Sequence, residues 1–251
     1  MTDLSGRTAL VTGGASGIGA ACAAAFARAG ASVIVADLDS GGAEKVAGSL
    51  GGNATAVGVD LADPGFDAAS LAGAADVVVN NAGIQHVSPV EEFPEDKFRL
   101  IIALMLEAPF RLARAALPHM YSQGWGRIVN ISSVHGLRAS AYKSAYVAAK
   151  HGLEGLSKTI ALEGGGRGVT SNTICPAYVR TPLVEKQIAD QARIHGIGED
   201  EVIEKIMLTE PAVKRLVEPS EVADLAVHLC SPAMSFANGS SYVLDGGWSA
   251  R

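Results

Sequence analysis

Three side chains whose types and spacing suit proton transfer are Ser133, Tyr146 and Lys150. Tyr146 and Lys150 are four residues apart in an alanine-rich segment, so they share one face if that segment is a helix. A neighbouring ammonium favours the phenolate of a tyrosine, whose phenol ordinarily has a pKa of about 10. Tyr146 would then act as a general acid or base near neutral pH, while Ser133 holds the substrate oxygen. Taken alone, such a pair is more often a contact on a helix surface.

A glycine-rich segment at 12–19 (TGGASGIG) follows a β-branched run and opens an alanine-rich one. Gly13, Gly17 and Gly19 would let the backbone approach a pyrophosphate at a helix N-terminus, although a tight turn is the simpler alternative. Asp37 ends the next apolar run, 18 residues after Gly19, where an acid suits the ribose hydroxyls of a dinucleotide; the alternative is a helix cap. Residues 36–40 contain no arginine for a 2′-phosphate, which predicts NAD rather than NADP.

Composition excludes several classes of protein. The chain has 251 residues, of which 48% are hydrophobic and 18% charged, so it is not a disordered chain. A net charge of −6 disfavours a nucleic-acid or anionic-membrane partner. Cys22, Cys175 and Cys230 form no CxxC pair, so neither a disulfide framework nor a metal site is expected. The sequence contains neither the apolar core of a signal peptide nor a membrane-length apolar run, which predicts a cytoplasmic protein.

Short β-branched runs alternate with longer alanine-rich stretches, which predicts an α/β fold: a single-domain, doubly wound parallel sheet of the Rossmann type. Strands are expected at 8–12, 32–36, 54–59, 76–80, 126–132, 169–175 and 241–244. Helices are expected at 17–30, 42–50, 95–123, 145–163 and 219–230, with a stunted helix within 61–75. Pro109 and Pro118 are expected positions for a kink in the long helix. Residues 183–212 are expected to form a helical lid over the substrate.

Together these motifs resemble the short-chain dehydrogenase/reductase family. The resemblance rests on the glycine loop, the run Asn80-Asn-Ala-Gly83, the Ser133 and Tyr146–Lys150 spacing, and Ile174-Cys-Pro176. It spans essentially the whole chain and implies a dinucleotide-dependent oxidoreductase that is a homotetramer. It assigns the cofactor phosphates to Gly13, Ser16, Gly17, Ile18 and Gly19, the adenosine ribose to Asp37, and the adenine to Asp60 and Leu61. It places Asn81, Ala82 and Gly83 along the cofactor, and Tyr146, Lys150, Pro176, Val179 and Thr181 at its nicotinamide half.

Five segments, at 83–90, 133–136, 146–152, 181–188 and 245–248, more narrowly resemble the bacterial D-3-hydroxybutyrate dehydrogenase branch of that family. This resemblance implies that Gln85, His135, Lys143 and Gln187 receive the substrate carboxylate, and a lysine with hydrogen-bond donors suits a small anion. Other interpretations are a solvated lysine at a helix start, a satisfied loop histidine and a surface glutamine. Trp248 would either pack a subunit interface or close a neighbouring subunit's site.

Three residues depart from the family pattern. Met105 stands where the family usually has an asparagine that is thought to hold a water in the proton relay. Ala177 replaces the glycine of a Pro-Gly turn, and Tyr178 stands where close relatives carry tryptophan. We expect NAD-dependent interconversion of D-3-hydroxybutyrate and acetoacetate. The alternatives are another small alcohol or ketone (a sugar, polyol or 3-oxoacyl thioester) and a catalytically weak dinucleotide-binding protein, to which Met105 points.

Overall fold

The computed structural model of the chain describes residues 2–250, apart from the side chains of residues 186, 194 and 195. Its described part is centred on one parallel sheet of seven strands in the order β3-β2-β1-β4-β5-β6-β7. The strands are β1 (Thr8–Thr12), β2 (Ser32–Asp37), β3 (Ala54–Gly58), β4 (Val77–Asn80), β5 (Gly126–Ile131), β6 (Val169–Pro176) and β7 (Ser241–Leu244). The chain order reverses between β1 and β4, so the doubly wound topology is confirmed.

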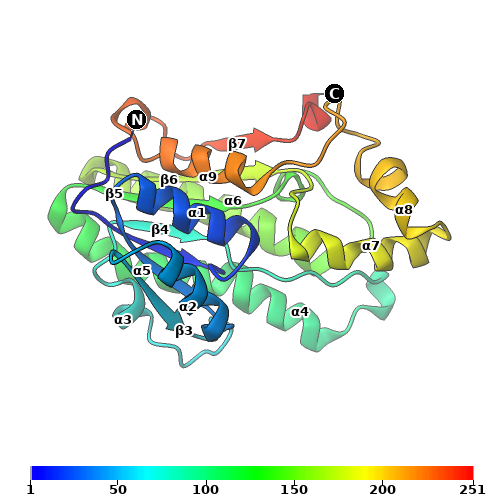
Figure 1. The fold of residues 1–251 in the computed structure, drawn as a ribbon, viewed down its shortest axis with the longest axis horizontal. Coiled ribbons are helices and arrows are strands. Elements are labelled where there is room, and N and C mark those ends of the chain that lie inside the picture. Colours follow the sequence, from blue (N-terminus) through cyan, green and yellow to red (C-terminus); the bar gives the residue numbers. More distant parts are fainter. Residues whose placement is uncertain (1, 251) are drawn as a thin grey trace.

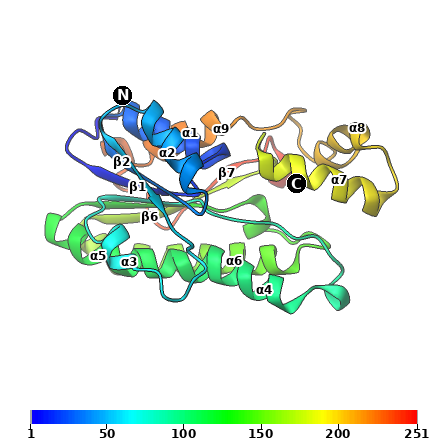
Figure 2. The same ribbon diagram turned by 60° about the horizontal axis from the view of Figure 1, so that its bottom comes forward.

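Helices cover both faces of the sheet (Figure 1). They are α1 (Gly17–Arg28), α2 (Ser40–Ser49), α3 (Ala68–Ala72), α4 (Glu95–Ile102), α5 (Ala108–Gln123), α6 (Ser144–Gly164), α7 (Pro182–His195), α8 (Glu199–Val202) and α9 (Pro219–His228). Figure 2 shows α1, α2 and α9 on one side of the sheet and α3 to α6 on the other. Because both faces are covered, β4 and β5 are buried at every residue.

The stunted helix expected within 61–75 is present as α3, which has 5 residues. The acid that caps α2 is Asp39 rather than Asp37, because an Asp39 carboxylate oxygen accepts a hydrogen bond from the Gly42 amide at 3.0 Å. This leaves Asp37, at the end of β2, for another role. No helix within residues 2–250 is long and apolar enough to cross a membrane.

The long helix expected at 95–123 is not continuous. A π-helical segment, Ala103–Glu107, separates α4 from α5, whereas the helix continues through Pro118. Pro109 has no N–H, so the Met105 carbonyl loses the donor that a regular α-helix would provide. The interruption therefore lies just before Pro109 and places Met105 in the wall of a cavity.

Residues 182–207 form a helical projection beyond one end of the sheet. It contains α7, α8 and a second π-helical segment, Ile203–Met207. Figure 2 shows α7 and α8 at the end towards which the chain leaves β7. Parallel strands present their carboxyl ends at the same edge, so this projection stands over the edge where α/β proteins bind ligands.

Candidate active site

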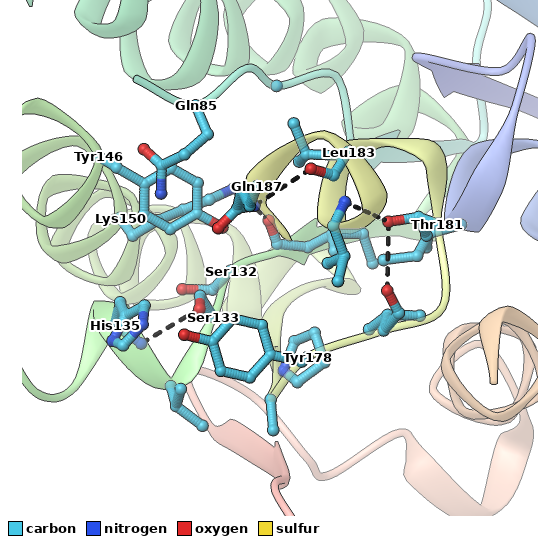
Figure 3. A pocket seen from close by; sticks show the side chains of 18 of the residues that line it. Gln85, Ser132, Ser133, His135, Tyr146, Lys150, Tyr178, Thr181, Leu183 and Gln187 are labelled. Atoms are coloured by element: carbon cyan, nitrogen blue, oxygen red, sulfur yellow. Dashed lines mark hydrogen bonds between the residues drawn. The ribbon is translucent and has the colours of Figure 1, made fainter. Parts of the chain in front are cut away.

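Ser133, Tyr146 and Lys150 meet in one cavity of about 720 Å³ at the carboxyl ends of the strands. Ser133 follows β5 and begins a short 3-10 turn, Val134–Gly136, in which its hydroxyl accepts a hydrogen bond from the His135 amide at 3.1 Å. Tyr146 and Lys150 lie on successive turns of α6, and the Lys150 ammonium is 5.6 Å from the centre of the Tyr146 ring. Figure 3 shows these side chains around the same space.

The protein environment raises the pKa of Tyr146 to about 12, chiefly because burial disfavours the phenolate; a hydrogen bond from Ser133 acts in the opposite direction. Burial likewise lowers the pKa of Lys150 to about 8. The Lys150 ammonium donates to the Ile131 carbonyl at 2.7 Å. In the protein alone, burial therefore outweighs the groups that favour the Tyr146 phenolate, and the contribution of Lys150 to that phenolate stays a prediction.

Lys143 is a buried lysine, only 2% exposed, and not a solvated residue at a helix start. It lines the same cavity, and its ammonium lies 3.4 Å from the Tyr178 hydroxyl. Tyr142, just before it, has a φ of 66°, an uncommon conformation for a residue with a side chain. The Tyr142 carbonyl accepts a hydrogen bond from the Ser88 amide at 2.9 Å, which ties the start of α6 to the segment that carries Gln85.

Gln85, His135 and Gln187 line the same cavity as Lys143. Gln187 is 7% exposed, which contradicts the surface interpretation. His135 Nδ1 and Gln187 Oε1 are buried and have no hydrogen-bond partner among the described residues. Burial, followed by the charge of Lys143, lowers the pKa of His135 to about 3, so its ring is neutral. A bound molecule with complementary polar atoms would satisfy these groups.

Trp248 lies in the cavity of its own chain. Its ring stacks on Tyr178 at 6.2 Å between centres with an interplanar angle of 16°, and it meets His135 edge-on at 5.5 Å. Both sequence interpretations of Trp248 placed it against another subunit, and neither describes this position. Together with Ala177 and Tyr178, Trp248 gives the cavity a wall that is mostly apolar, and Lys143 lies beside this wall at Tyr178.

Met105 is 1% exposed and packs with Ile101, Ala145 and Ala149 between α4 and α6. Its terminal methyl lies 3.3 Å from the position that a β-carbon on Gly83 would take. The thioether therefore fills the space with apolar atoms, and it can supply at most a weak hydrogen-bond acceptor. The residue lines the same cavity as Tyr146 and Lys150.

The glycine loop adjoins a second, longer groove of about 1270 Å³. Gly13 has a φ of 63°, and a β-carbon there would lie 2.9 Å from the Asn81 amide nitrogen. The Asn81 side chain in turn donates to the carbonyls of Thr12 at 2.9 Å and Gly13 at 3.2 Å. Asp37 accepts hydrogen bonds from the amides of Ala15 at 2.9 Å and Asp39 at 3.0 Å, which fixes its carboxylate in this groove.

Most residues assigned to the cofactor line this groove. They are Gly13, Ser16, Gly17, Ile18, Asp37, Asp60, Leu61, Asn81, Ala82, Gly83 and Thr181. Pro176 and Val179 line the neighbouring cavity instead, and the two spaces share Ile18, Asn81, Gly83, Thr181 and Leu183. Gly19 lines neither, and a β-carbon there would lie 2.0 Å from the Gly13 carbonyl oxygen, so it serves close packing of the loop.

Sequence reasoning missed several lining residues. Leu38, 73% exposed, follows Asp37 in the long groove, and Ser132 precedes Ser133 in the cavity. The signal available in the sequence for Leu38 was its position directly after Asp37, at the end of a predicted strand. Residues 2–250 contain no group of three or more His, Cys, Asp or Glu side chains that could hold a metal ion.

Comparison with known proteins agrees with this geometry. A family model described as enoyl-(acyl carrier protein) reductase matches residues 13–249. D-beta-hydroxybutyrate dehydrogenase of Rhizobium meliloti is 45% identical, with 98% of this chain and 99% of that protein covered. The protein of the same name from Cupriavidus necator is 44% identical over 99% of this chain and its full length. This chain belongs to the short-chain dehydrogenase/reductase family. It is therefore an oxidoreductase that acts on a small molecule.

Solved structures of this short-chain dehydrogenase/reductase family share the fold. A protein from Beutenbergia cavernae, named as a proposed NAD(P)-dependent gluconate 5-dehydrogenase, has a TM-score of 0.88 and 36% identity over 99% of both chains, and it was solved with bound NADP at low occupancy. One from Agrobacterium tumefaciens, named as a proposed 2-deoxy-D-gluconate 3-dehydrogenase, has bound NADP, a TM-score of 0.87 and 34% identity over 99% of this chain and 98% of its own. These neighbours support a dinucleotide cofactor and leave NAD and NADP undistinguished.

Proposed function

We propose that this oxidoreductase interconverts D-3-hydroxybutyrate and acetoacetate with NAD. The observation that carries the proposal is the buried Lys143 ammonium, which forms no ion pair with any carboxylate in the described residues. A buried charge without a counter-ion is costly, so the cavity favours a ligand that brings an anion. A short hydroxy acid carries both a carboxylate for Lys143 and a hydroxyl for Tyr146.

The proposed substrate would lie between Lys143 and Tyr146 in the cavity. Its carboxylate would accept hydrogen bonds from Lys143, from the Gln85 amide, and from the second N–H of the Gln187 amide, whose nitrogen also donates to the Leu183 carbonyl. Because the ring of His135 is neutral, it can donate from one nitrogen and accept at the other. The apolar wall of Tyr178 and Trp248 would hold the methyl group. This arrangement fixes the C3 hydroxyl against Tyr146 and Ser133.

The residues of the long groove fit a dinucleotide. Gly13 lies so close to Asn81 that any side chain at position 13 would fill the space beside the glycine loop. The first turn of α1 offers backbone amides to a pyrophosphate. Bound NAD would supply the hydride acceptor for the alcohol. Asp37 would accept hydrogen bonds from the adenosine ribose hydroxyls, and its negative charge would repel a 2′-phosphate.

In the oxidation direction, Tyr146 takes the hydroxyl proton as general base. Ser133 donates a hydrogen bond to the same oxygen and holds it in place. The Lys150 ammonium stabilises the phenolate that this step requires, and it would also orient the nicotinamide ribose. In the reduction direction the same phenol returns the proton. The positive charge of oxidised nicotinamide would further favour the phenolate.

A lid is part of the same proposal. Leu183, Val184 and Gln187 of α7 line the cavity, which supports the proposal that residues 183–212 form a lid over the substrate. Closure of this segment would exclude water and bring the Gln187 amide to the carboxylate. We also propose a homotetramer, the assembly that the family resemblance implies, and sedimentation equilibrium would test it by mass.

The second candidate is a longer hydroxy acid, such as a sugar acid. The Tyr178 hydroxyl beside Lys143 favours it, because this hydroxyl offers a hydrogen-bond partner inside an otherwise apolar wall. The experiment is NAD reduction with a panel of both enantiomers of 3-hydroxybutyrate, sugar acids, polyols and a 3-hydroxyacyl thioester. Preference for D-3-hydroxybutyrate supports the proposal, preference for a polyhydroxy acid selects the second candidate, and turnover of only uncharged alcohols contradicts both.

A further inference from the structure

A buried carboxylate lies one helical turn after the proposed catalytic lysine. Glu154, 4% exposed, is one turn after Lys150 on α6. It accepts three hydrogen bonds: from Thr173 at 2.8 Å, from Ser241 at 2.7 Å and from the Cys175 thiol at 3.2 Å. The three donors come from β6 and β7. A carboxylate that accepts from three donors matches the ionised form, which has only acceptors.

Other charged or titratable groups around Lys150 do not balance its charge. On α6 its neighbours are Tyr146 and Glu154, and η3, the Val134–Gly136 turn, contributes only the neutral His135. From β6, Cys175 presents a thiol whose pKa is raised to about 12 by burial, so it stays protonated. The π-helical segment packed on α6 carries Glu107, which is exposed to solvent.

Glu154 is thus the buried anion nearest in sequence to Lys150, at the four-residue spacing that brings side chains together on a helix. Gly136 connects this anion to the catalytic loop, because a β-carbon there would lie 3.3 Å from a Glu154 oxygen and 2.4 Å from the Ser132 hydroxyl. The carboxylate therefore lies under the loop that presents Ser133, and its negative charge, one helical turn from Lys150, acts to raise the pKa of that lysine.

We propose that Glu154 is a positioning residue for the reaction: its carboxylate forms no direct ion pair with Lys150 among the described residues, but its charge acts through space to favour protonated Lys150, and it clamps β6 and β7 beneath the catalytic loop. This inference rests on the proposed roles of Tyr146 and Lys150. Removing a negative charge lowers the pKa of every nearby group, because it disfavours protonated lysine and favours phenolate. Loss of Glu154 charge must therefore shift both limbs of the pH profile of activity to lower pH.

The test compares Glu154→Gln with Glu163→Gln, which removes the same charge from an exposed position on the same helix. The first readout is the titration of Lys150 by NMR of lysine-labelled protein without cofactor, with Lys150→Met to assign the signal. We expect the Lys150 pKa to fall by roughly one unit in Glu154→Gln and to stay unchanged in Glu163→Gln. The second readout is the pH profile of kcat/KM at saturating NAD, with the same direction of shift.

A purely structural role for Glu154 gives a different result: lower thermal stability or kcat with an unshifted Lys150 titration, which overturns the proposal. If Glu154→Gln does not fold, the triple variant Glu154→Met, Thr173→Val, Ser241→Ala removes the acceptor and two of its donors together, a change that is nearly neutral for stability. The same shift is expected from it. The NMR titration does not depend on turnover of a hydroxy acid. A failure of the proposed substrate is therefore distinguishable from a failure of the proposed role of Glu154.

Discussion

The Lys150 ammonium lies 5.6 Å from the centre of the Tyr146 ring and is bound to the Ile131 carbonyl at 2.7 Å. The cation is therefore held by the end of β5. In this arrangement the burial of both groups controls their pKa values: that of Tyr146 rises and that of Lys150 falls. Both shifts favour the uncharged forms, which are the phenol of Tyr146 and the amine of Lys150. A ligand that brings positive charge near Tyr146 would counteract the first shift, because positive charge stabilises the phenolate.

The first prediction concerns the proton-transfer group. Tyr146→Phe removes only the phenolic hydroxyl and keeps the buried ring, so the fold and the long groove should be preserved. We expect kcat to fall by at least ~10²-fold, the low end for general acid–base catalysis. NAD affinity, measured by calorimetry, should stay within a few-fold. Tyr121→Phe, near the end of α5 and outside the lining of the cavity and the groove, is the matched control; near-normal turnover of Tyr146→Phe removes Tyr146 from the mechanism.

The second prediction concerns cofactor choice. Asp37 is fixed in the long groove by two backbone amides, and its charge opposes a 2′-phosphate. We expect kcat/KM for NAD to exceed that for NADP by at least ~10-fold, or about 1.4 kcal/mol. Asp37→Ser with Leu38→Arg should reverse this preference, because arginine supplies a partner for the phosphate. Equal kcat/KM for both cofactors in the native protein contradicts the prediction.

The third prediction concerns Met105. An asparagine at this position would enter a cluster of Ile101, Ala145 and Ala149, where its amide would lack partners. Since such a group costs about 1–3 kcal/mol, we expect Met105→Asn to lower the melting temperature by several degrees. Its kcat should rise by no more than ~10-fold, about 1.4 kcal/mol of barrier, because other groups carry the proton. A rise of several hundredfold from almost no activity would show that this sequence is a disabled enzyme.

The fourth prediction is a pH dependence of stability. Burial lowers the pKa of His135 from 6.5 to about 3, so the unfolded chain binds a proton on this side chain that the folded chain does not. The contribution of neutral His135 to the free energy of unfolding is fully present above pH 6.5 and is lost as the pH falls towards 3. His135→Phe keeps an aromatic ring that does not titrate. Its melting temperature should therefore fall less between pH 7.5 and about 5 than that of the native protein. The exposed His228→Gln, on α9, is the control because this histidine does not contribute to the His135 shift, and equal losses in all three proteins refute the prediction.

The sequence predicted the fold well because its signals are local. The alternation of short β-branched runs with alanine-rich stretches indicated a parallel sheet, and the glycines at 13, 17 and 19 indicated a loop that opens the first helix. The π-helical segment was missed, because a proline usually suggests a kink at its own position. Here the missing N–H changes the turn before it.

The candidate site was predictable in its residue types but not in their environments. The burial of Lys143 depends on Tyr178, which is 35 residues away, and on the unusual backbone of Tyr142. Trp248 reaches the cavity from the far end of the chain, which no local pattern indicates. Glu154 looked like one more charge on a helix, and only the approach of β6 and β7 shows that it is buried.

The most direct test of the proposed activity compares D-3-hydroxybutyrate with its methyl ester in the native protein and in Lys143→Ala. If the carboxylate binds at Lys143, the native protein favours the acid by at least ~10-fold in kcat/KM, which is about 1.4 kcal/mol, and Lys143→Ala loses most of this preference while KM for NAD changes little. Lys158→Ala, which changes an exposed lysine on the same helix, retains it. Equal oxidation of acid and ester by the native protein would contradict the account.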